Sequence, residues 1–93
     1  MAEIEVQAAD LGPHYEFEVA VRERGTMTQH RVTLAKADYE RLASGKASPE
    51  LLVTESFRFL LEREPKESIL RSFDLTLIGY YFPEYERQIR KRL

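Results

Sequence analysis

The stretch HYEFEVAVRERGTMTQHRVTL, His14 to Leu34, carries the clearest structural pattern in this chain of 93 residues. Its first half alternates apolar and polar side chains, which is typical of a half-buried β-strand. The same alternation resumes after Arg24-Gly25, a pair suited to a tight hairpin turn because glycine accepts a positive φ. The pattern therefore predicts two antiparallel strands, over residues 15–23 and 27–34.

Centring the turn on Arg24-Gly25 determines which residues of the two strands lie opposite each other. One face then pairs Val21 with Thr28, Val19 with His30, Phe17 with Val32 and Tyr15 with Leu34. On the other face Glu18 lies opposite Arg31, a favourable cross-strand pair. The preceding EIEVQA also alternates and predicts a further strand over residues 3–8. A third strand or a helical cover is needed, because a two-stranded hairpin alone is only marginally stable.

The apolar period changes from two to between three and four after residue 35, which indicates helices. The predicted helices cover residues 36–44, 49–64, 66–73, 75–81 and 83–92. The second is the clearest, since Ser48 suits the N-cap and Pro49 the first helical position. Strands followed by helices favour an α+β fold with a small antiparallel sheet packed against the helices. The length fits a single domain over residues 1–93.

Composition narrows the classes of function. Fourteen basic and 16 acidic residues leave a net charge of −2, so nucleic acid and anionic membranes exert no bulk attraction. The chain has no cysteine, which excludes disulfides, thiolate catalysis and cysteine-ligated metals. The N-terminal MAEIEVQAAD has no apolar core of the kind found in signal peptides, and no apolar run is long enough to cross a membrane. We expect a cytoplasmic protein.

Candidate catalytic and metal-binding groups are few. The hairpin register places His14 and His30 on opposite faces of the sheet, so they cannot share a metal ion or act as an acid–base pair. We expect His30 to be a partly buried structural histidine. Glu16 and Glu18 share the outer face and could bracket a cation, but acidic residues there also protect strand edges from aggregation. No nucleophile or glycine-rich phosphate motif is present, so we expect no enzyme and no cofactor.

The segment IGYYFPEYE, Ile78 to Glu86, concentrates aromatic side chains at Tyr80, Tyr81, Phe82 and Tyr85. Tyrosine suits interfaces because a large apolar ring carries a hydroxyl that can stay in water. Pro83 divides the cluster and leaves Tyr85 on the apolar side of the last helix. We expect Phe82 and one of the two preceding tyrosines to close the core, with the other tyrosine at the surface.

Four basic residues, Arg87, Arg90, Lys91 and Arg92, lie in the last helix. The aromatic cluster favours a non-enzymatic protein that acts through another protein or through self-association as a homodimer. The alternative is a nucleic-acid-binding regulator that uses the basic helix, which strong salt-dependent binding would reveal. Loss of a dimer on substitution of Tyr81 and Phe82 would favour the first interpretation.

The runs SFRFLLEREP, SILRSFDL and YYFPEYE resemble a family of small bacterial proteins of unknown function. The resemblance covers the C-terminal half closely and HRVTLAKADYERLASG more loosely. It implies no activity, cofactor or catalytic residue. The combination of a small sheet with helices is also similar to antitoxins of the HicB type, although this chain lacks their C-terminal DNA-binding segment.

Overall fold

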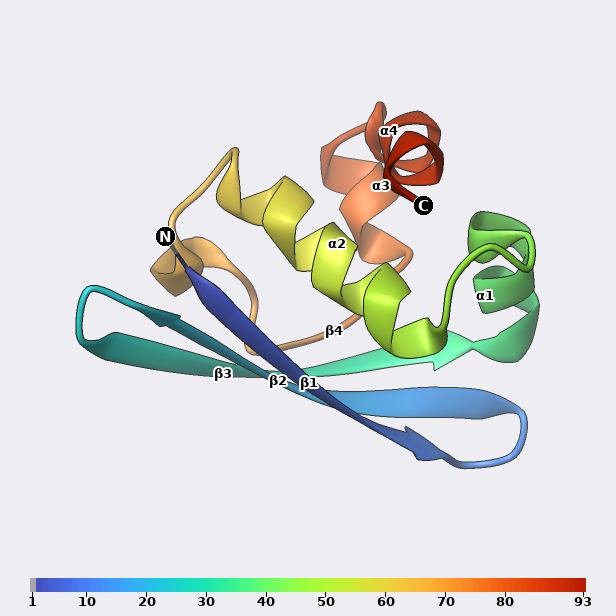
Figure 1. Ribbon diagram of the computed structural model, residues 1–93, viewed down its shortest axis with the longest axis horizontal. Coiled ribbons are helices and arrows are strands. Elements are labelled where there is room, and N and C mark those ends of the chain that lie inside the picture. The colour runs from blue at the N-terminus through green and yellow to red at the C-terminus, as the bar shows by residue number, and fades with distance from the viewer. Residues whose placement is uncertain (1) are drawn as a thin grey trace.

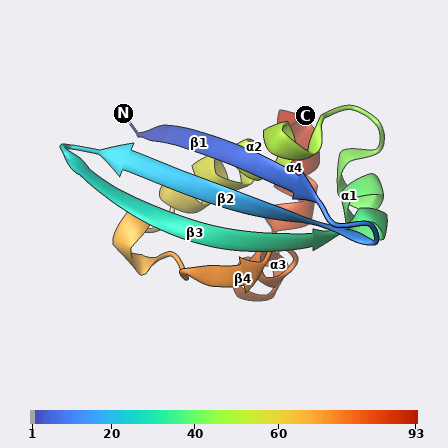
Figure 2. The ribbon, with the colours of Figure 1, turned by 90° about the horizontal axis from the view of Figure 1, so that it is seen from below.

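The computed structural model describes residues 2–93 as a four-stranded sheet with all helices on one face (Figure 1). The strands are β1 (Glu3–Asp10), β2 (His14–Glu23), β3 (Thr26–Ala35) and β4 (Ser72–Asp74), and they lie in that order across the sheet (Figure 2). The first three are antiparallel, and the short β4 runs parallel to β3. The α+β class predicted from the sequence is confirmed.

The predicted hairpin register is confirmed at every position. Val21 lies opposite Thr28 and Glu18 opposite Arg31, whose Nε is 3.0 Å from the Glu18 carboxylate. Arg24 and Gly25 have φ values of 55° and 79°, as a type I′ turn requires of both central residues. The predicted strand over 3–8 is also confirmed, and it places Ile4 and Val6 on the inner face against Val21 and Val19.

The helices are α1 (Lys36–Ala43), α2 (Pro49–Leu61), α3 (Leu77–Tyr81) and α4 (Tyr85–Arg92), with a single 3₁₀ turn, η1 (Lys66–Ser68). The Ser48 side chain caps α2 by accepting a hydrogen bond of 3.1 Å from the Leu51 N–H. Helix α2 ends at residue 61 and not at the predicted residue 64. The helical conformation is disfavoured for the residue before a proline, so the helix ends ahead of Pro65 and residues 62–64 form a turn and a bend.

The predicted helix over 66–73 is wrong. Of the residues predicted to be helical in this range, only those of the 3₁₀ turn η1 are so, and the chain then becomes extended and forms β4 beside β3. The Arg31 N–H donates to the Arg71 carbonyl at 2.8 Å, and the Leu75 N–H donates to the Thr33 carbonyl at 2.9 Å. The free edge of β3 supplies hydrogen-bond partners for the backbone of this segment. A short helix with little tertiary packing would be only marginally stable in its place. Phe73 then lies opposite Val32 and packs beside Phe57.

The last two predicted helices are shorter than expected. Helix α3 covers 77–81 of the predicted 75–81, because Asp74 first forms a turn by accepting from the Thr76 N–H and hydroxyl. Helix α4 begins at Tyr85, two residues after Pro83, where residues 83–92 were predicted. Helix α1 ends at Ala43, one residue short of the predicted end, because Ser44 adopts a positive φ of 50°.

The hydrophobic core lies between the inner face of the sheet and α2. Phe17, Val32, Leu52 and Phe57 are fully buried there, and α4 adds the buried Ile89 from the far side of α2. The outer face of β2 and β3 is mostly polar and includes the exposed Glu18, Arg22, Gln29 and Arg31. No helix in residues 2–93 is long and apolar enough to cross a membrane.

Candidate functional site

Tyr85 belongs to the hydrophobic core of the described chain. Its side chain is fully buried, and its ring lies 5.3 Å from that of Phe59. Its hydroxyl is 2.7 Å from the Ser56 Oγ, which in turn donates to the Leu52 carbonyl. Burial raises the pKa of the Tyr85 hydroxyl and keeps it protonated. Tyr85, one of the four aromatic candidates for an interface, is thus fully buried among the core side chains of the described chain.

The other three aromatic candidates separate. Phe82 is half-buried and packs edge-on against Phe59 at 5.9 Å between ring centroids. Tyr80 and Tyr81 are 86% and 66% exposed, so the expectation that one of them closes the core is wrong. Ile78, which is 3% exposed, is the residue of the same helix that packs into the core. The cluster therefore supplies two exposed tyrosines.

Tyr81 borders an apolar groove of about 360 Å³ between α3 and the end of α2. The groove is lined by apolar side chains of Leu60, Leu70, Phe73, Leu77, Ile78 and Tyr81. Leu70, which lines the same groove, is 47% exposed. Tyr80 lies in a different hollow beside Pro83, so adjacent tyrosines serve different surfaces.

Glu64 and Ser68 are the polar residues of the apolar groove. Glu64 is half-buried, and burial raises the pKa of its carboxyl. Neither a hydrogen bond nor an ion pair from the described chain counters that effect, since desolvation is its only cause. Glu62, two residues earlier, contrasts with it, because its hydrogen bond with Arg92 lowers the pKa of the Glu62 carboxyl.

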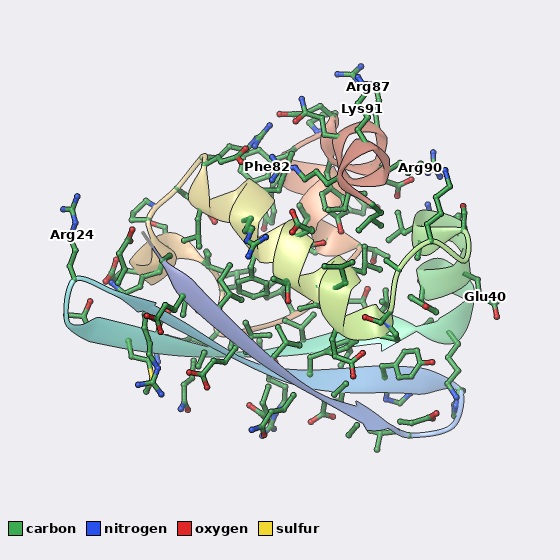
Figure 3. The ribbon with its side chains drawn as sticks, in the orientation of Figure 1. Arg24, Glu40, Phe82, Arg87, Arg90 and Lys91 are labelled. Atoms are coloured by element: carbon green, nitrogen blue, oxygen red, sulfur yellow. The ribbon has the colours of Figure 1, made fainter. Side chains whose placement is uncertain are left out.

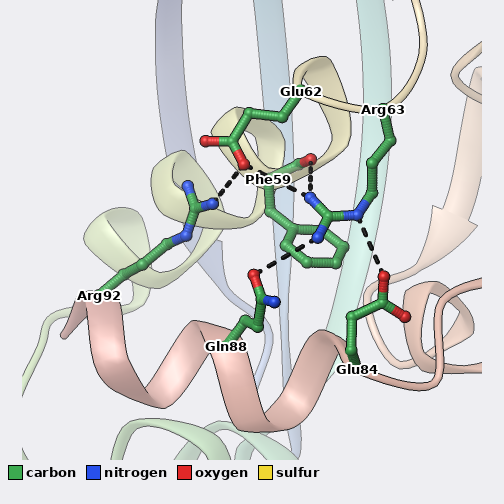
Figure 4. Close-up of polar contacts among 6 residues, drawn as sticks. All are labelled: Phe59, Glu62, Arg63, Glu84, Gln88 and Arg92. Carbon is green, nitrogen blue, oxygen red and sulfur yellow. Dashed lines mark hydrogen bonds and ion pairs between the residues drawn. The ribbon is translucent and has the colours of Figure 1, made fainter.

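Arg63 lies between Glu62 and Glu64 in the sequence. Its side chain holds α4 against α2 (Figure 4). Its guanidinium lies 3.5 Å from the centroid of the Phe59 ring and donates to the Phe59 carbonyl at 3.0 Å. It also donates to Glu84 at 3.3 Å and to Gln88 at 3.4 Å. Its donors are thus directed to α2 and α4. Arg63 is a structural clamp and does not neutralise Glu64.

The four basic candidates of α4 also separate. Arg92 donates to Glu62 at 2.6 Å and is half-buried, so it belongs to the helix–helix contact (Figure 4). Arg87, Arg90 and Lys91 are exposed and extend away from the body of the molecule (Figure 3). None of these three forms an ion pair with a residue of the described chain. A smaller basic surface than predicted therefore remains at α4.

The histidines lie where the register placed them. His30 is 1% exposed, with Nε2 2.8 Å from the Thr28 hydroxyl and Nδ1 2.8 Å from the Leu70 carbonyl. Both ring nitrogens thus have partners, and His30 is more deeply buried than the partial burial that was expected. Glu16 and Glu18 both lie within 3.3 Å of the Arg31 guanidinium, so a cation already bridges them. No three His, Asp or Glu side chains of residues 2–93 are grouped to hold a metal ion.

Two features of the described surface remain after these contacts are assigned. One is the apolar groove with Tyr81, Leu70 and Glu64, and the other is the basic surface of α4. The groove offers shape and apolar area, whereas α4 offers only charge. Comparisons of the chain with protein-family models, with curated proteins and with solved structures found no match.

Proposed function

We propose that this chain is a small, non-enzymatic cytoplasmic protein that binds a segment of another protein in the apolar groove. The observation that carries the proposal is the pair Tyr81 and Leu70, which are 66% and 47% exposed and line the same groove. A domain of this size buries a limited fraction of its surface, so large apolar side chains left in water are costly. Exposed apolar patches rimmed by polar residues are typical of binding sites.

The volume and composition of the groove suit a few side chains of a partner. About 360 Å³ lies near the lower end of ligand pockets, which are mostly apolar with a few polar groups. Tyrosine adds large contact area at a low entropic cost, since only two side-chain torsions become ordered on binding. Two or three apolar anchors of a partner would bury Tyr81 and Leu70 together.

The experiment introduces a photo-cross-linking amino acid at position 81 in the cell that makes the protein, with position 80 as the matched control. The cross-linked partner is then purified, and its dissociation constant is measured for the wild type, Leu70→Ser, Tyr81→Ser and Tyr80→Ser. We expect the first two substitutions to weaken binding and the third to leave it unchanged, because Tyr80 lies outside the groove.

Equal binding by all four proteins would refute the proposal. The other molecule that could fill the groove is a second copy of the same chain. Sedimentation velocity on the purified chain tests this possibility. A concentration-dependent dimer that is lost in Tyr81→Ser would assign the groove to self-association as a homodimer.

A second candidate function is nucleic-acid binding through α4, favoured by the exposed Arg87, Arg90 and Lys91. Three phosphate contacts predict that log K falls with log salt concentration with a slope of roughly −2 to −3. The test measures DNA and RNA binding across a salt series for the wild type and for a variant with all three residues changed to Gln. Binding that is absent, or equal in the two proteins, would exclude this candidate.

A further inference from the structure

Glu64 is the one carboxylate among the residues that line the apolar groove in the described chain. Its neighbours in sequence cannot neutralise it, because Arg63 is directed to α2 and α4 and the Lys66 amine donates to Glu67 at 2.6 Å. An ionised carboxylate in such surroundings loses hydration without gaining a partner. Filling the groove with apolar side chains would remove still more water from Glu64 and raise that cost.

We propose that the partner segment bound in the apolar groove carries a Lys or Arg beside its apolar anchors, and that this cation pairs with Glu64. The inference rests on the proposed function and specifies the chemistry of the partner. Charge complementarity carries it, since an unpaired acid on an apolar wall matches a segment that is both apolar and basic. Ser68, which also lines the groove, offers a hydroxyl that can accept from the same cation.

The pair would supply specificity more than affinity. A segment with the same apolar anchors and no cation would bury Glu64 without compensation, and an acidic segment would add like-charge repulsion. The groove would therefore reject most apolar segments that its shape alone would admit. This gives a reason for the presence of a carboxylate at a position where a neutral residue would cost less.

The test selects binders of the full-length protein from a phage-displayed library of random linear peptides. The selected peptides are synthesised, and their dissociation constants are measured by calorimetry. Groove binding is defined by loss of affinity in both Leu70→Ser and Tyr81→Ser and by retention in Tyr80→Ser. Circular dichroism confirms that each variant is folded. Peptides that meet this definition are then aligned for basic residues.

We expect groove-binding peptides to be enriched in Lys or Arg within four residues of their apolar anchors. Glu64→Gln should weaken them roughly ten- to a hundredfold, the range expected for a hydrogen bond to a charged group. Glu40→Gln is the matched control, because Glu40 is exposed on α1, far from the groove, and the substitution changes the net charge equally (Figure 3). Glu64→Lys should restore binding to a peptide whose basic residue is changed to Glu.

The outcomes separate the two proposals. Groove-binding peptides without basic enrichment, or with equal affinity for wild type and Glu64→Gln, would overturn the pairing with Glu64 and leave the groove as a binding site. A selection that gives no peptide sensitive to Leu70→Ser and Tyr81→Ser would overturn the groove itself, and the inference with it.

Discussion

The buried hydroxyl pair of Tyr85 and Ser56 allows a quantitative test of how α4 is held against α2. Ser56 has one hydroxyl proton, and it is directed to the Leu52 carbonyl at 2.7 Å. The hydrogen bond of 2.7 Å between the two hydroxyls is therefore donated by Tyr85. Removing either partner leaves the other in a different state, so the two single substitutions should not be equivalent.

Ser56→Ala leaves the fully buried Tyr85 hydroxyl without an acceptor. An unsatisfied buried donor costs about 1–3 kcal/mol. Alanine returns about 0.5 kcal/mol because it is the better helix former. The expected net loss in the free energy of unfolding is about 1.5 kcal/mol. Tyr85→Phe leaves Ser56 bonded to the Leu52 carbonyl, so only one net hydrogen bond is lost, at about 1 kcal/mol.

The double variant Ser56→Ala, Tyr85→Phe should lose much less than the sum of the single losses. No unpaired hydroxyl remains in it, and replacing both partners by apolar groups can be nearly neutral. We expect a loss of about 1 kcal/mol or less, which corresponds to a coupling energy of at least about 1.5 kcal/mol. Urea unfolding followed by circular dichroism, with linear extrapolation, measures each free energy.

Thr54→Ala is the matched control. Thr54 makes the same bond to a carbonyl one turn back, Glu50 at 2.8 Å, but its hydroxyl has no tertiary partner in the described chain. That variant should be neutral or slightly stabilised. Additive losses within about 0.5 kcal/mol in the double variant would refute the reasoning. So would a Ser56→Ala protein as stable as the wild type.

Three further predictions concern the described contacts. Burial lowers the pKa of His30 below its ordinary value of 6.5. As pH falls, the unfolded state therefore takes up a proton before the folded state does, and the free energy of unfolding should fall below about pH 6.5. In urea titrations at a series of pH values, His30→Gln should flatten this fall and His14→Gln should not. Arg63→Lys should lower the free energy of unfolding by about 1–2 kcal/mol, because an ammonium cannot stack on Phe59 and bond to both helices. Arg58→Lys, at an exposed ion pair, is the control and should lower it by less than about 0.5 kcal/mol. Equal losses in the two variants would contradict the structural role given to Arg63. Burial raises the pKa of Glu64, so its ionised form weakens the fold as pH rises through that pKa. Glu64→Gln should therefore raise Tm at pH 7. Scanning calorimetry should show that the gain in Tm vanishes below the ordinary glutamate pKa of 4.5.

The hairpin could be predicted because every signal for it lies within 21 residues. Alternation defines the inner face, Gly25 permits the turn, and the pair Glu18 and Arg31 agrees with the same register. A shift of one residue would turn every apolar side chain to the wrong face, so few alternatives compete. The Ser48-Pro49 start of α2 is local in the same way.

The segment after Pro65 could not be predicted, because what decides it lies far away in sequence. Ile69, Leu70 and Phe73 have the spacing of a helix, yet the chain forms β4 because β3, about 40 residues earlier, offers a free edge. Tyr80 and Tyr81 are similar to each other in sequence terms and face different hollows. No local signal distinguishes Glu62, paired with Arg92, from Glu64, which has no such partner.

The amino-acid sequence by itself determined the α+β class and the register of the β2–β3 hairpin, since periodicity and turn residues act over short distances. Only the tertiary structure decided that residues 72–74 form a strand, that Arg92 is used internally, and that Leu70, Tyr81 and Glu64 meet in one groove. These depend on which surfaces remain uncovered once α2 and α3 have packed on the sheet. Exposure and the pairing of charges are properties of the whole fold, and no short window of the sequence contains them.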